Sequence, residues 1–235
     1  MTDNREEQLR NEFNEWAANG RGEEMEDHHR SIAEQTLAAM DLKAGERVLD
    51  LSCGAGWATR LLANAVEGRS AAGAEGSAIG LDISDEMIAR ARAASRDFEN
   101  IMFVCSPAQE IPWADEYFDK VLSIEAFYYF PDQEAVLREL LRVLRPGGSL
   151  FILINLYREN HYSLRWVGEL KVPVHARSEQ EYVEMLRRCG FSEVEAKRVE
   201  DFTPTPETYS GKWFSSAAEL ADFKRIGALL LVARK

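Results

Sequence analysis

The sequence predicts an α/β protein with a doubly wound, mostly parallel sheet and helices on both faces. Two observations predict this class. Short apolar stretches with strand character alternate with stretches whose apolar residues recur every three or four positions, as on one face of a helix. A glycine-containing turn, Ser52–Gly56, also joins one such strand directly to one such helix. The 235 residues, 46% of them hydrophobic, suffice for one substantial core.

Two helices are expected before the sheet, because Leu9, Phe13 and Trp16 fall at helical spacing and a second apolar series runs from Ile32 to Met40. Residues 19–22 break the pattern between them. The expected strands that follow are 47–51, 78–82, 101–104, 118–124 and 149–156. The stretch 67–77 is rich in Gly, Ala and Ser and predicts a loop at the far edge of the sheet. Before Pro146, one apolar stripe predicts a core-facing helix: Val136, Leu137, Leu140, Leu141 and Leu144.

The last third of the chain continues the pattern less regularly. Ser178–Glu181 is a capping box that opens a helix, and Gly190 ends it. The inward-facing residues of this helix are expected to be Tyr182, Val183, Leu186 and Cys189. A strand at 194–199, an extra helix around 216–226 and an apolar strand at 227–233 follow.

The turn after the first strand predicts a nucleotide-like ligand. Gly54 and Gly56 lack a Cβ, so the backbone can approach a ligand closely, and the helix behind points its free N–H groups at the same spot. A dinucleotide would favour Gly-x-Gly-x-x-Gly with an acid about 20 residues on. Here Thr59 replaces the third glycine, Trp57 is bulky, and the acid, Asp82, comes 28 residues after Gly54. These departures disfavour NAD but leave a dinucleotide oxidoreductase open as an alternative.

Four motifs in order resemble those of the class I S-adenosylmethionine-dependent methyltransferases, of the small-molecule type 11 kind. They are Asp50–Gly56, Leu81–Ser84, Ala108–Trp113 with Phe118–Ser123, and Leu141–Leu150, and they cover roughly residues 45–155. The resemblance implies a Rossmann-like sheet of seven strands with one antiparallel strand. It implies one methyltransferase domain over 1–235, with an N-terminal helical cap (1–44), a cofactor-binding core (45–156) and acceptor-side helices with the last two strands (157–235).

The resemblance also implies S-adenosyl-L-methionine as the cofactor and a set of residues that bind it. These are Asp50, Ser52, Cys53, Gly54, Gly56, Asp82, Ile83, Met87, Ala108, Gln109, Ile124 and Glu125. Asp82 is expected to hold the ribose hydroxyls, and Glu125 either to approach the cofactor's ammonium group or to cap its loop. Pro107 stands where related enzymes often carry an Asp facing adenine, which leaves that contact to the Ala108 N–H and the Gln109 side chain.

The loop after the fourth strand borders the transferable methyl group in the family it resembles. Tyr129 and Tyr128 are therefore expected to line the site, with packing alone as the alternative. His29, in a His28–His29 pair placed just before the second helix, is the candidate base near neutral pH, with a solvated pair as its alternative. Further candidate walls of the acceptor pocket are Trp16, Tyr157, His161, Tyr162 and Trp166.

Motifs that are absent narrow the acceptor to a small molecule: no Asn/Asp-Pro-Pro-Tyr follows the fourth strand, and the paired-glutamate loop of protein arginine methyltransferases is not evident. The formal net charge of −12 disfavours nucleic acid, for which Lys212, Lys224 and Arg225 are the best local contacts.

No apolar run spans a bilayer and no signal-peptide core opens the chain, so a cytoplasmic protein is expected. A monomer or a homodimer is expected. Three cysteines without Cys-x-x-Cys spacing indicate no metal, and Cys53 and Cys105 are expected to be buried. A nucleic-acid or protein methyltransferase and a non-catalytic cofactor-binding module stay open as alternatives.

Overall fold

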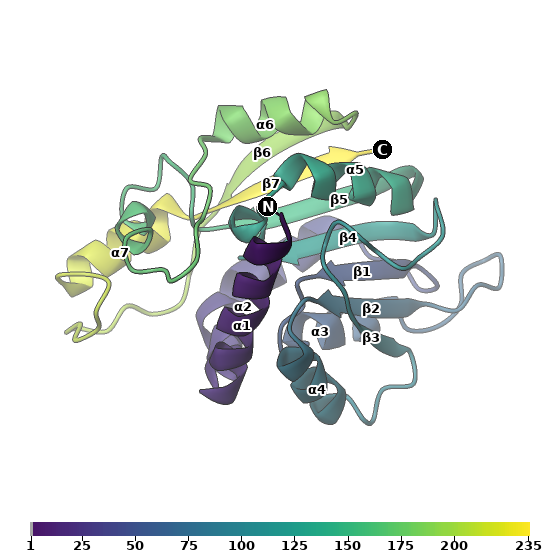
Figure 1. Cartoon of the computed structure of the whole chain (residues 1–235), viewed down its shortest axis with the longest axis horizontal. Helices are drawn as coiled ribbons and strands as arrows, with labels where there is room; N and C mark the ends of the chain where they lie inside the picture. The colour runs from purple at the N-terminus through teal and green to yellow at the C-terminus, as the bar shows by residue number, and fades with distance from the viewer. Residues whose placement is uncertain (1) are drawn as a thin grey trace.

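The structure, a computed structural model, describes residues 2–235, and for residues 2–4 and 23 it describes the backbone alone. One seven-stranded sheet crosses the molecule in the order β3-β2-β1-β4-β5-β7-β6 (Figure 1). Its strands are β1 Arg47–Leu51, β2 Ser77–Asp82, β3 Ile101–Cys105, β4 Phe118–Ile124, β5 Leu144–Ile154, β6 Ser192–Val199 and β7 Ala228–Arg234. Only β7 runs against its neighbours, pairing antiparallel with both β5 and β6. The predicted fold class is confirmed.

Helices cover both faces of this sheet. They are α1 Thr2–Ala18, α2 Arg21–Met40, α3 Trp57–Val66, α4 Asp85–Ala94, α5 Gln133–Val143, α6 Glu179–Arg188 and α7 Ala217–Ile226, with short 3-10 helices η1 Phe127–Tyr129 and η2 Ser163–Trp166. In Figure 1, α5 and α6 lie on one side of the sheet and α3 and α4 on the other. Helix α1 stands across the left-hand ends of the strands, and α2 starts there and then packs along the face that α3 covers. Those ends are the carboxyl ends of the parallel strands, where ligands of such sheets bind.

The two N-terminal helices differ from the prediction at their junction. The break is confined to Asn19 and Gly20, where Gly20 adopts a left-handed conformation (φ 75°), and α2 begins at Arg21. The expectation that His28 and His29 precede the second helix is therefore wrong, because both lie inside α2. A run of Glu, Met, Asp and His residues forms good helix when the opposite face can pack, as Ile32 and Ala33 do here.

The core confirms the apolar patterns. Val136, Leu137 and Leu140 are fully buried and Leu141 is partly buried, so the stripe of α5 faces the sheet. Leu144 is also fully buried, but it is the first residue of β5 and not part of the predicted helix. The capping box of α6 is also confirmed: the Ser178 hydroxyl accepts the Glu181 N–H at 3.2 Å, and the Ser178 N–H donates to a Glu181 carboxylate oxygen at 2.6 Å. The extra helix is α7, capped by Ser216. The loop 67–76 lies at the amino ends of the strands, at the right of Figure 1.

Candidate active site

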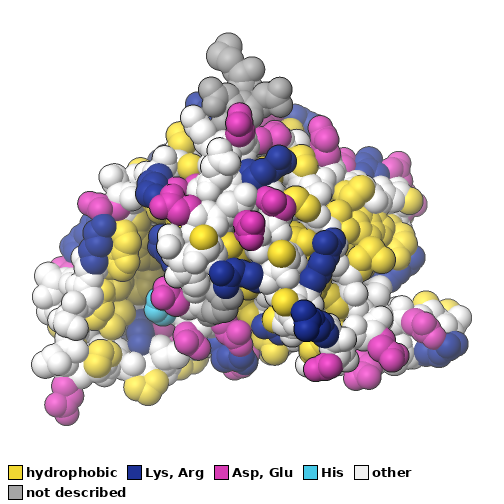
Figure 2. All heavy atoms as spheres, turned by 60° about the horizontal axis from the view of Figure 1, so that its bottom comes forward, with side chains coloured by type: hydrophobic (Ala, Val, Ile, Leu, Met, Phe, Trp, Pro, Cys, Tyr) yellow, Lys and Arg dark blue, Asp and Glu magenta, His cyan; other side chains and the backbone are white. Residues whose placement is uncertain are grey.

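A cavity of about 510 Å³ opens at the carboxyl ends of the parallel strands. Its walls come from the turn after β1, the end of β2, the loops after β3 and β4, both N-terminal helices, and the segment between β5 and β7. Figure 2 shows a hollow with largely hydrophobic walls on the left of the molecule, the side on which α7 lies in Figure 1. Concave, mostly apolar sites with a few convergent polar groups are typical of small-molecule binding.

The turn after β1 is tied to the end of β2 through one carboxylate. The Gly54 N–H donates to Asp82 Oδ2 at 2.9 Å, and the Ser84 N–H donates to Oδ1 at 2.9 Å. Burial raises the pKa of Asp82, while these two backbone donors oppose the rise. Each oxygen keeps a lone pair. Asp82 lines the cavity, so the carboxylate is available to hydroxyl donors of a ligand.

Asp50, at the carboxyl end of β1, is buried beneath the same turn. Its Oδ2 accepts the Thr59 hydroxyl at 2.6 Å, so the residue that replaces the third glycine of a dinucleotide motif has a hydrogen-bonding role here. Burial raises the pKa of Asp50 to about 7. Ser52 adopts a left-handed backbone conformation (φ 62°), an uncommon state for a residue that carries a Cβ.

Gly56 is an expected cofactor residue that is not among those lining the cavity. It has φ 76°, and a Cβ added to it would lie 2.7 Å from the Phe103 ring and 2.9 Å from the Ala91 Cβ. Its close approach is therefore to side chains of β3 and α4, and its role is packing. Gly54 has open space around its Cα and does line the cavity.

The other expected cofactor residues line the cavity together. Besides Asp50, Ser52, Gly54 and Asp82, these are Cys53, Ile83, Met87, Ala108, Gln109, Ile124 and Glu125. Cys53 is buried as predicted. The expectation for Cys105 is wrong: it ends the edge strand β3 and is exposed, because no strand pairs beyond it.

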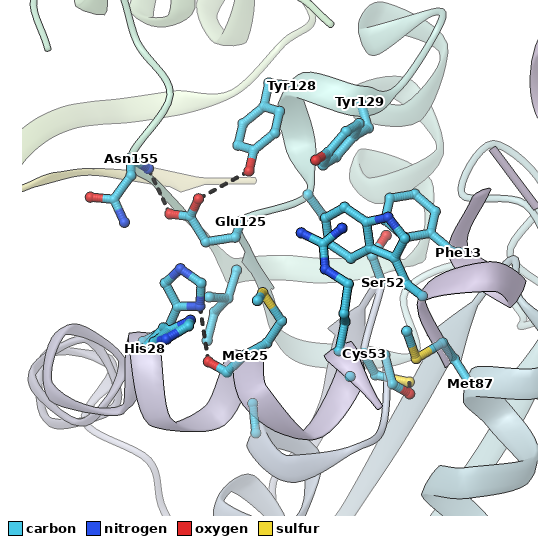
Figure 3. Close-up of a pocket in the computed structure, with 18 of the residues that line it drawn as sticks. Phe13, Met25, His28, Ser52, Cys53, Met87, Glu125, Tyr128, Tyr129 and Asn155 are labelled. Carbon is cyan, nitrogen blue, oxygen red and sulfur yellow. Dashed lines mark hydrogen bonds between the residues drawn. The ribbon is translucent and has the colours of Figure 1, made fainter. Parts of the chain in front are cut away.

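Glu125, directly after β4, points its carboxylate at the neighbouring elements (Figure 3). The Asn155 N–H donates to Oε1 at 2.6 Å and the Tyr128 hydroxyl donates to Oε2 at 3.0 Å. Glu125 has a left-handed backbone conformation (φ 53°), a costly state for a non-glycine residue that these two bonds help to hold. Burial raises its pKa to about 7.

The two tyrosines after β4 both line the cavity. Their ring centroids lie 4.6 Å apart, and Tyr129 makes an edge contact of 5.1 Å with Phe13 of α1. Burial raises the pKa of both phenols above their ordinary value. They therefore stay protonated near neutral pH and can donate hydrogen bonds but not accept a proton.

His29 lines the cavity from α2. Its Nδ1 lies 2.9 Å from the Met25 carbonyl oxygen, and because a carbonyl only accepts, the proton is assigned to Nδ1 and the lone pair to Nε2. Burial lowers the pKa of His29 to about 4. The imidazole is thus neutral at physiological pH, and it is a weaker base than free imidazole.

Comparison with known proteins places this fold and site in one family. Residues 49–152 match the model of a family described as methyltransferase domain. The 27-O-demethylrifamycin SV methyltransferase of Amycolatopsis mediterranei is 30% identical over 198 residues, which are 81% of this chain and 70% of that protein. A methyltransferase solved in complex with the Haloferax volcanii Trm112 methyltransferase activator is 32% identical, with a TM-score of 0.86 over 95% of this chain and 97% of that one.

The chain belongs to the class I S-adenosylmethionine-dependent methyltransferases. The cofactor of this family is S-adenosylmethionine, and the cavity fits it, since a buried carboxylate with spare lone pairs lies beside a small-residue turn. The methyltransferase GfsG of Streptomyces halstedii is 38% identical over 122 residues. The matches with it and with a demethylmenaquinone methyltransferase span 42% and 52% of those relatives, about half their length.

The acceptor side of the methyltransferase is only partly as expected. Trp16 and Trp166 line the cavity, but Tyr157, His161 and Tyr162 do not. The Tyr157 hydroxyl donates instead to the Gly227 carbonyl at 2.9 Å, and its ring is fully buried. The sequence reading missed several lining residues: Phe13, Arg21, Met25, Asn155, Tyr209, Trp213, Phe214 and Phe223. Among these residues, Arg21 had a local sequence feature that could have drawn attention to it, since it lies between Gly20 and Gly22.

The basic residues singled out as a nucleic-acid contact are each beside an acid. Lys212 pairs with Glu169, Arg225 with Asp222, and Lys224 lies 4.0 Å from an Asp201 oxygen. Within residues 2–235 no group of three or more His, Cys, Asp or Glu side chains is placed to hold a metal ion. None of the helices described is both long and apolar enough to cross a membrane.

Proposed function

We propose that this methyltransferase transfers the methyl group of S-adenosylmethionine to an oxygen, nitrogen or carbon nucleophile of a small molecule, by in-line displacement and without a metal ion. The observation that carries the proposal is the cavity of about 510 Å³, which continues from the turn after β1 to aromatic walls. The aromatic walls come from segments far apart in the chain: Phe13, Trp16, Trp166, Tyr209, Trp213, Phe214 and Phe223. Two relatives are named for small-molecule acceptors, demethylmenaquinone and 27-O-demethylrifamycin SV.

The cofactor is assigned to residues at the carboxyl ends of the parallel strands. Asp82 would accept the ribose hydroxyls through its spare lone pairs, and the Ala108 N–H with the Gln109 side chain would meet adenine. Ser52 and Cys53 would contact the methionine part, where their small side chains leave room. S-adenosylmethionine supplies a methyl group on a positively charged sulfur, which is already activated for displacement.

On the acceptor side, His29 would offer the lone pair assigned to Nε2, but burial lowers its pKa to about 4 and makes it a weaker base than free imidazole. Glu125 belongs to the cofactor side, where its carboxylate would meet the ammonium group. Tyr129 stays protonated and would orient the acceptor by donating a hydrogen bond, while Tyr128, whose hydroxyl donates to Glu125, would shape the pocket beside it. Alignment of the acceptor is the main contribution expected of the protein, since positioning lowers such barriers by roughly 7–11 kcal/mol.

A two-stage experiment tests the function. Calorimetric titration with S-adenosylhomocysteine, with NAD and NADP alongside, should show one site for the first ligand alone. Transfer of labelled methyl to a panel of phenols, quinols and amines should then exceed transfer to bulk RNA or bulk protein, and a chelator should leave it unchanged. Binding without any transfer would favour the non-catalytic module, and label in RNA or protein would overturn the small-molecule assignment.

We further propose that an activator protein of the Trm112 kind binds the open edge of the sheet at β3. The support is the 32% identical neighbour solved in complex with such an activator. Strand β3 carries no charged residue and its Met102 side chain is 57% exposed, whereas the opposite edge, β6, carries Glu193, Glu195, Lys197 and Arg198. A hollow of about 340 Å³ also lies against β3. Charged edges resist strand pairing and uncharged ones accept it.

Co-purification with the Haloferax volcanii Trm112 protein as the probe tests this edge. Met102→Asp should lower its affinity for this chain at least about tenfold, because a charge would be buried at the contact. Lys197→Asp on the β6 edge is the matched control and should have no effect. Equal binding of both variants would overturn the β3 assignment.

A further inference from the structure

Arg21, the first residue of α2, is a cation of the cavity wall without an acidic partner. Its guanidinium carbon lies 3.8 Å from the centroid of the Trp16 ring, and among the described side chains it has no hydrogen bond or ion pair. Lys224, which also lines the cavity, donates to the Thr203 hydroxyl at 2.7 Å and lies beside Asp201. A guanidinium inside a mostly apolar pocket is best stabilised by an anion, so we expect Arg21 to bind an anionic group of a ligand.

The position of Arg21 is set by the residue that follows it. Gly22 is buried, and a Cβ added to it would lie 2.9 Å from Met87 Sδ and 3.3 Å from the Ala55 Cβ. Helix α2 therefore begins directly against the turn after β1 and the start of α4. Figure 3 places Ser52, Cys53 and Met87 on one side of the pocket and Glu125 with Tyr128 on the other. Arg21, which lines the cavity, is therefore adjacent in the chain to the residue packed against this turn.

The guanidinium is held in place by a chain of contacts from α1. The Trp16 indole N–H donates to Glu12 Oε1 at 2.7 Å, which orients the ring, and the ring face carries Arg21. A guanidinium stacked on an aromatic face keeps its N–H groups free at its edge, ready for two parallel bonds to a carboxylate. Burial raises the pKa of the Tyr129 hydroxyl and the charge of Arg21 opposes that rise, so the two groups are near one another in the pocket.

We propose that Arg21 binds the α-carboxylate at the methionine end of S-adenosylmethionine. This inference rests on the proposed function. With the ribose assigned to Asp82, adenine to Ala108 and the methionine part to Ser52 and Cys53, the amino-acid end would lie at the turn after β1, against which α2 begins. That end carries one permanent anion and one ammonium group. Arg21 would supply the matching cation, and Glu125, which lines the same cavity, would supply a carboxylate for the ammonium group, so the pocket would complement the zwitterion.

The test compares two ligands that differ only in the amino-acid part. S-adenosylhomocysteine has the carboxylate, and 5′-methylthioadenosine has the same nucleoside and thioether without it. In calorimetric titrations of the full chain, Arg21→Gln should weaken S-adenosylhomocysteine about 10- to 100-fold, the loss expected for hydrogen bonds between charged groups. The affinity for 5′-methylthioadenosine should stay within about twofold, since it makes no contact with Arg21.

Arg60→Gln is the matched control. Arg60 donates to the Ala55 carbonyl at 3.2 Å, so it carries a positive charge against the same turn, but it does not line the cavity. This variant should leave both affinities unchanged. A thermal unfolding scan of each variant confirms that it is folded before titration.

Three outcomes overturn the inference. Arg21→Gln could lower the affinity for both ligands by the same factor, which would show that its effect is structural. It could weaken neither and raise the KM of the acceptor instead, which would make Arg21 an acceptor-binding residue. The wild-type protein could bind neither ligand, and then the proposed function itself fails. A loss confined to S-adenosylhomocysteine supports the assignment.

Discussion

The backbone N–H of Gly54 donates a 2.9 Å hydrogen bond to Asp82 Oδ2, joining two positions 28 residues apart. The other carboxylate oxygen accepts the Ser84 N–H at 2.9 Å. The turn after β1 and the start of α4 are therefore fixed to one buried acid before any ligand arrives. Preorganisation of this kind lowers the entropic cost of binding.

Asp82→Ala is expected to weaken binding of S-adenosylhomocysteine by about 1.5–3 kcal/mol for each ribose hydrogen bond lost to the charged acceptor. Calorimetric titration measures it. Asp85→Ala is the control, because Asp85 is exposed in the first turn of α4 and does not line the cavity. An affinity of Asp82→Ala equal to that of the wild type would remove Asp82 from the ribose site.

Tyr129→Phe is expected to lower turnover about 2- to 10-fold, the range for loss of one uncharged hydrogen bond, with cofactor affinity nearly intact. The reason is that the phenol lines the cavity while the ring keeps its edge contact with Phe13. Steady-state rates with saturating cofactor measure the effect. Tyr117→Phe, outside the cavity, should not change the rate. The same rate for Tyr129→Phe would leave Tyr129 with a packing role alone.

Glu125→Gln should become increasingly stabilising relative to the wild type as pH rises. Burial raises the pKa of Glu125 from 4.5 to about 7, so the folded state binds this proton more tightly than the unfolded state. Ionisation of Glu125 therefore weakens folding, and its contribution to the free energy of unfolding falls as pH rises between those two values. Glutamine keeps an oxygen that accepts the Asn155 N–H, its NH2 group can donate to the Tyr128 oxygen, and it carries no charge.

Urea unfolding of both proteins at several pH values measures this difference. Asp50, whose pKa burial also raises to about 7, and His29 are present in both proteins, so their contributions cancel to first order. A difference that stays constant across the window would show that Glu125 ionises at its ordinary pKa.

Gly56→Ala and Gly54→Ala form a matched pair for the turn. Both glycines have positive φ, so each alanine costs roughly 1–2 kcal/mol of backbone strain. At Gly56 the added Cβ would also lie 2.7 Å from the Phe103 ring, and such overpacking costs about 1–3 kcal/mol more. Chemical denaturation should therefore rank Gly56→Ala as the less stable variant. An equal loss of unfolding free energy in the two variants would mean that the Phe103 ring moves aside without cost.

Local patterns predicted those features whose cause is local. The stripe of α5, the capping box of α6 and the strand ends around Asp50 and Asp82 depend on residue spacing and on backbone hydrogen bonds between near neighbours. The position of His29 was predicted less well, because a helix that begins after a single left-handed glycine leaves a weak local signal. The exposure of Cys105 depends on strand order, which residue spacing does not encode.

The sequence by itself determined the fold class, the family resemblance and the turn proposed to meet the cofactor. The reason is that the spacing of apolar residues, the positions of the glycines and the acids at the strand ends are all local features of the sequence. Only the tertiary structure decided which side chains share the cavity. Arg21, Glu125 and Phe223 come from segments up to 202 positions apart, since 223 minus 21 is 202. Their meeting depends on how helices pack on the sheet, and that packing follows from burial across the whole chain rather than from any one segment.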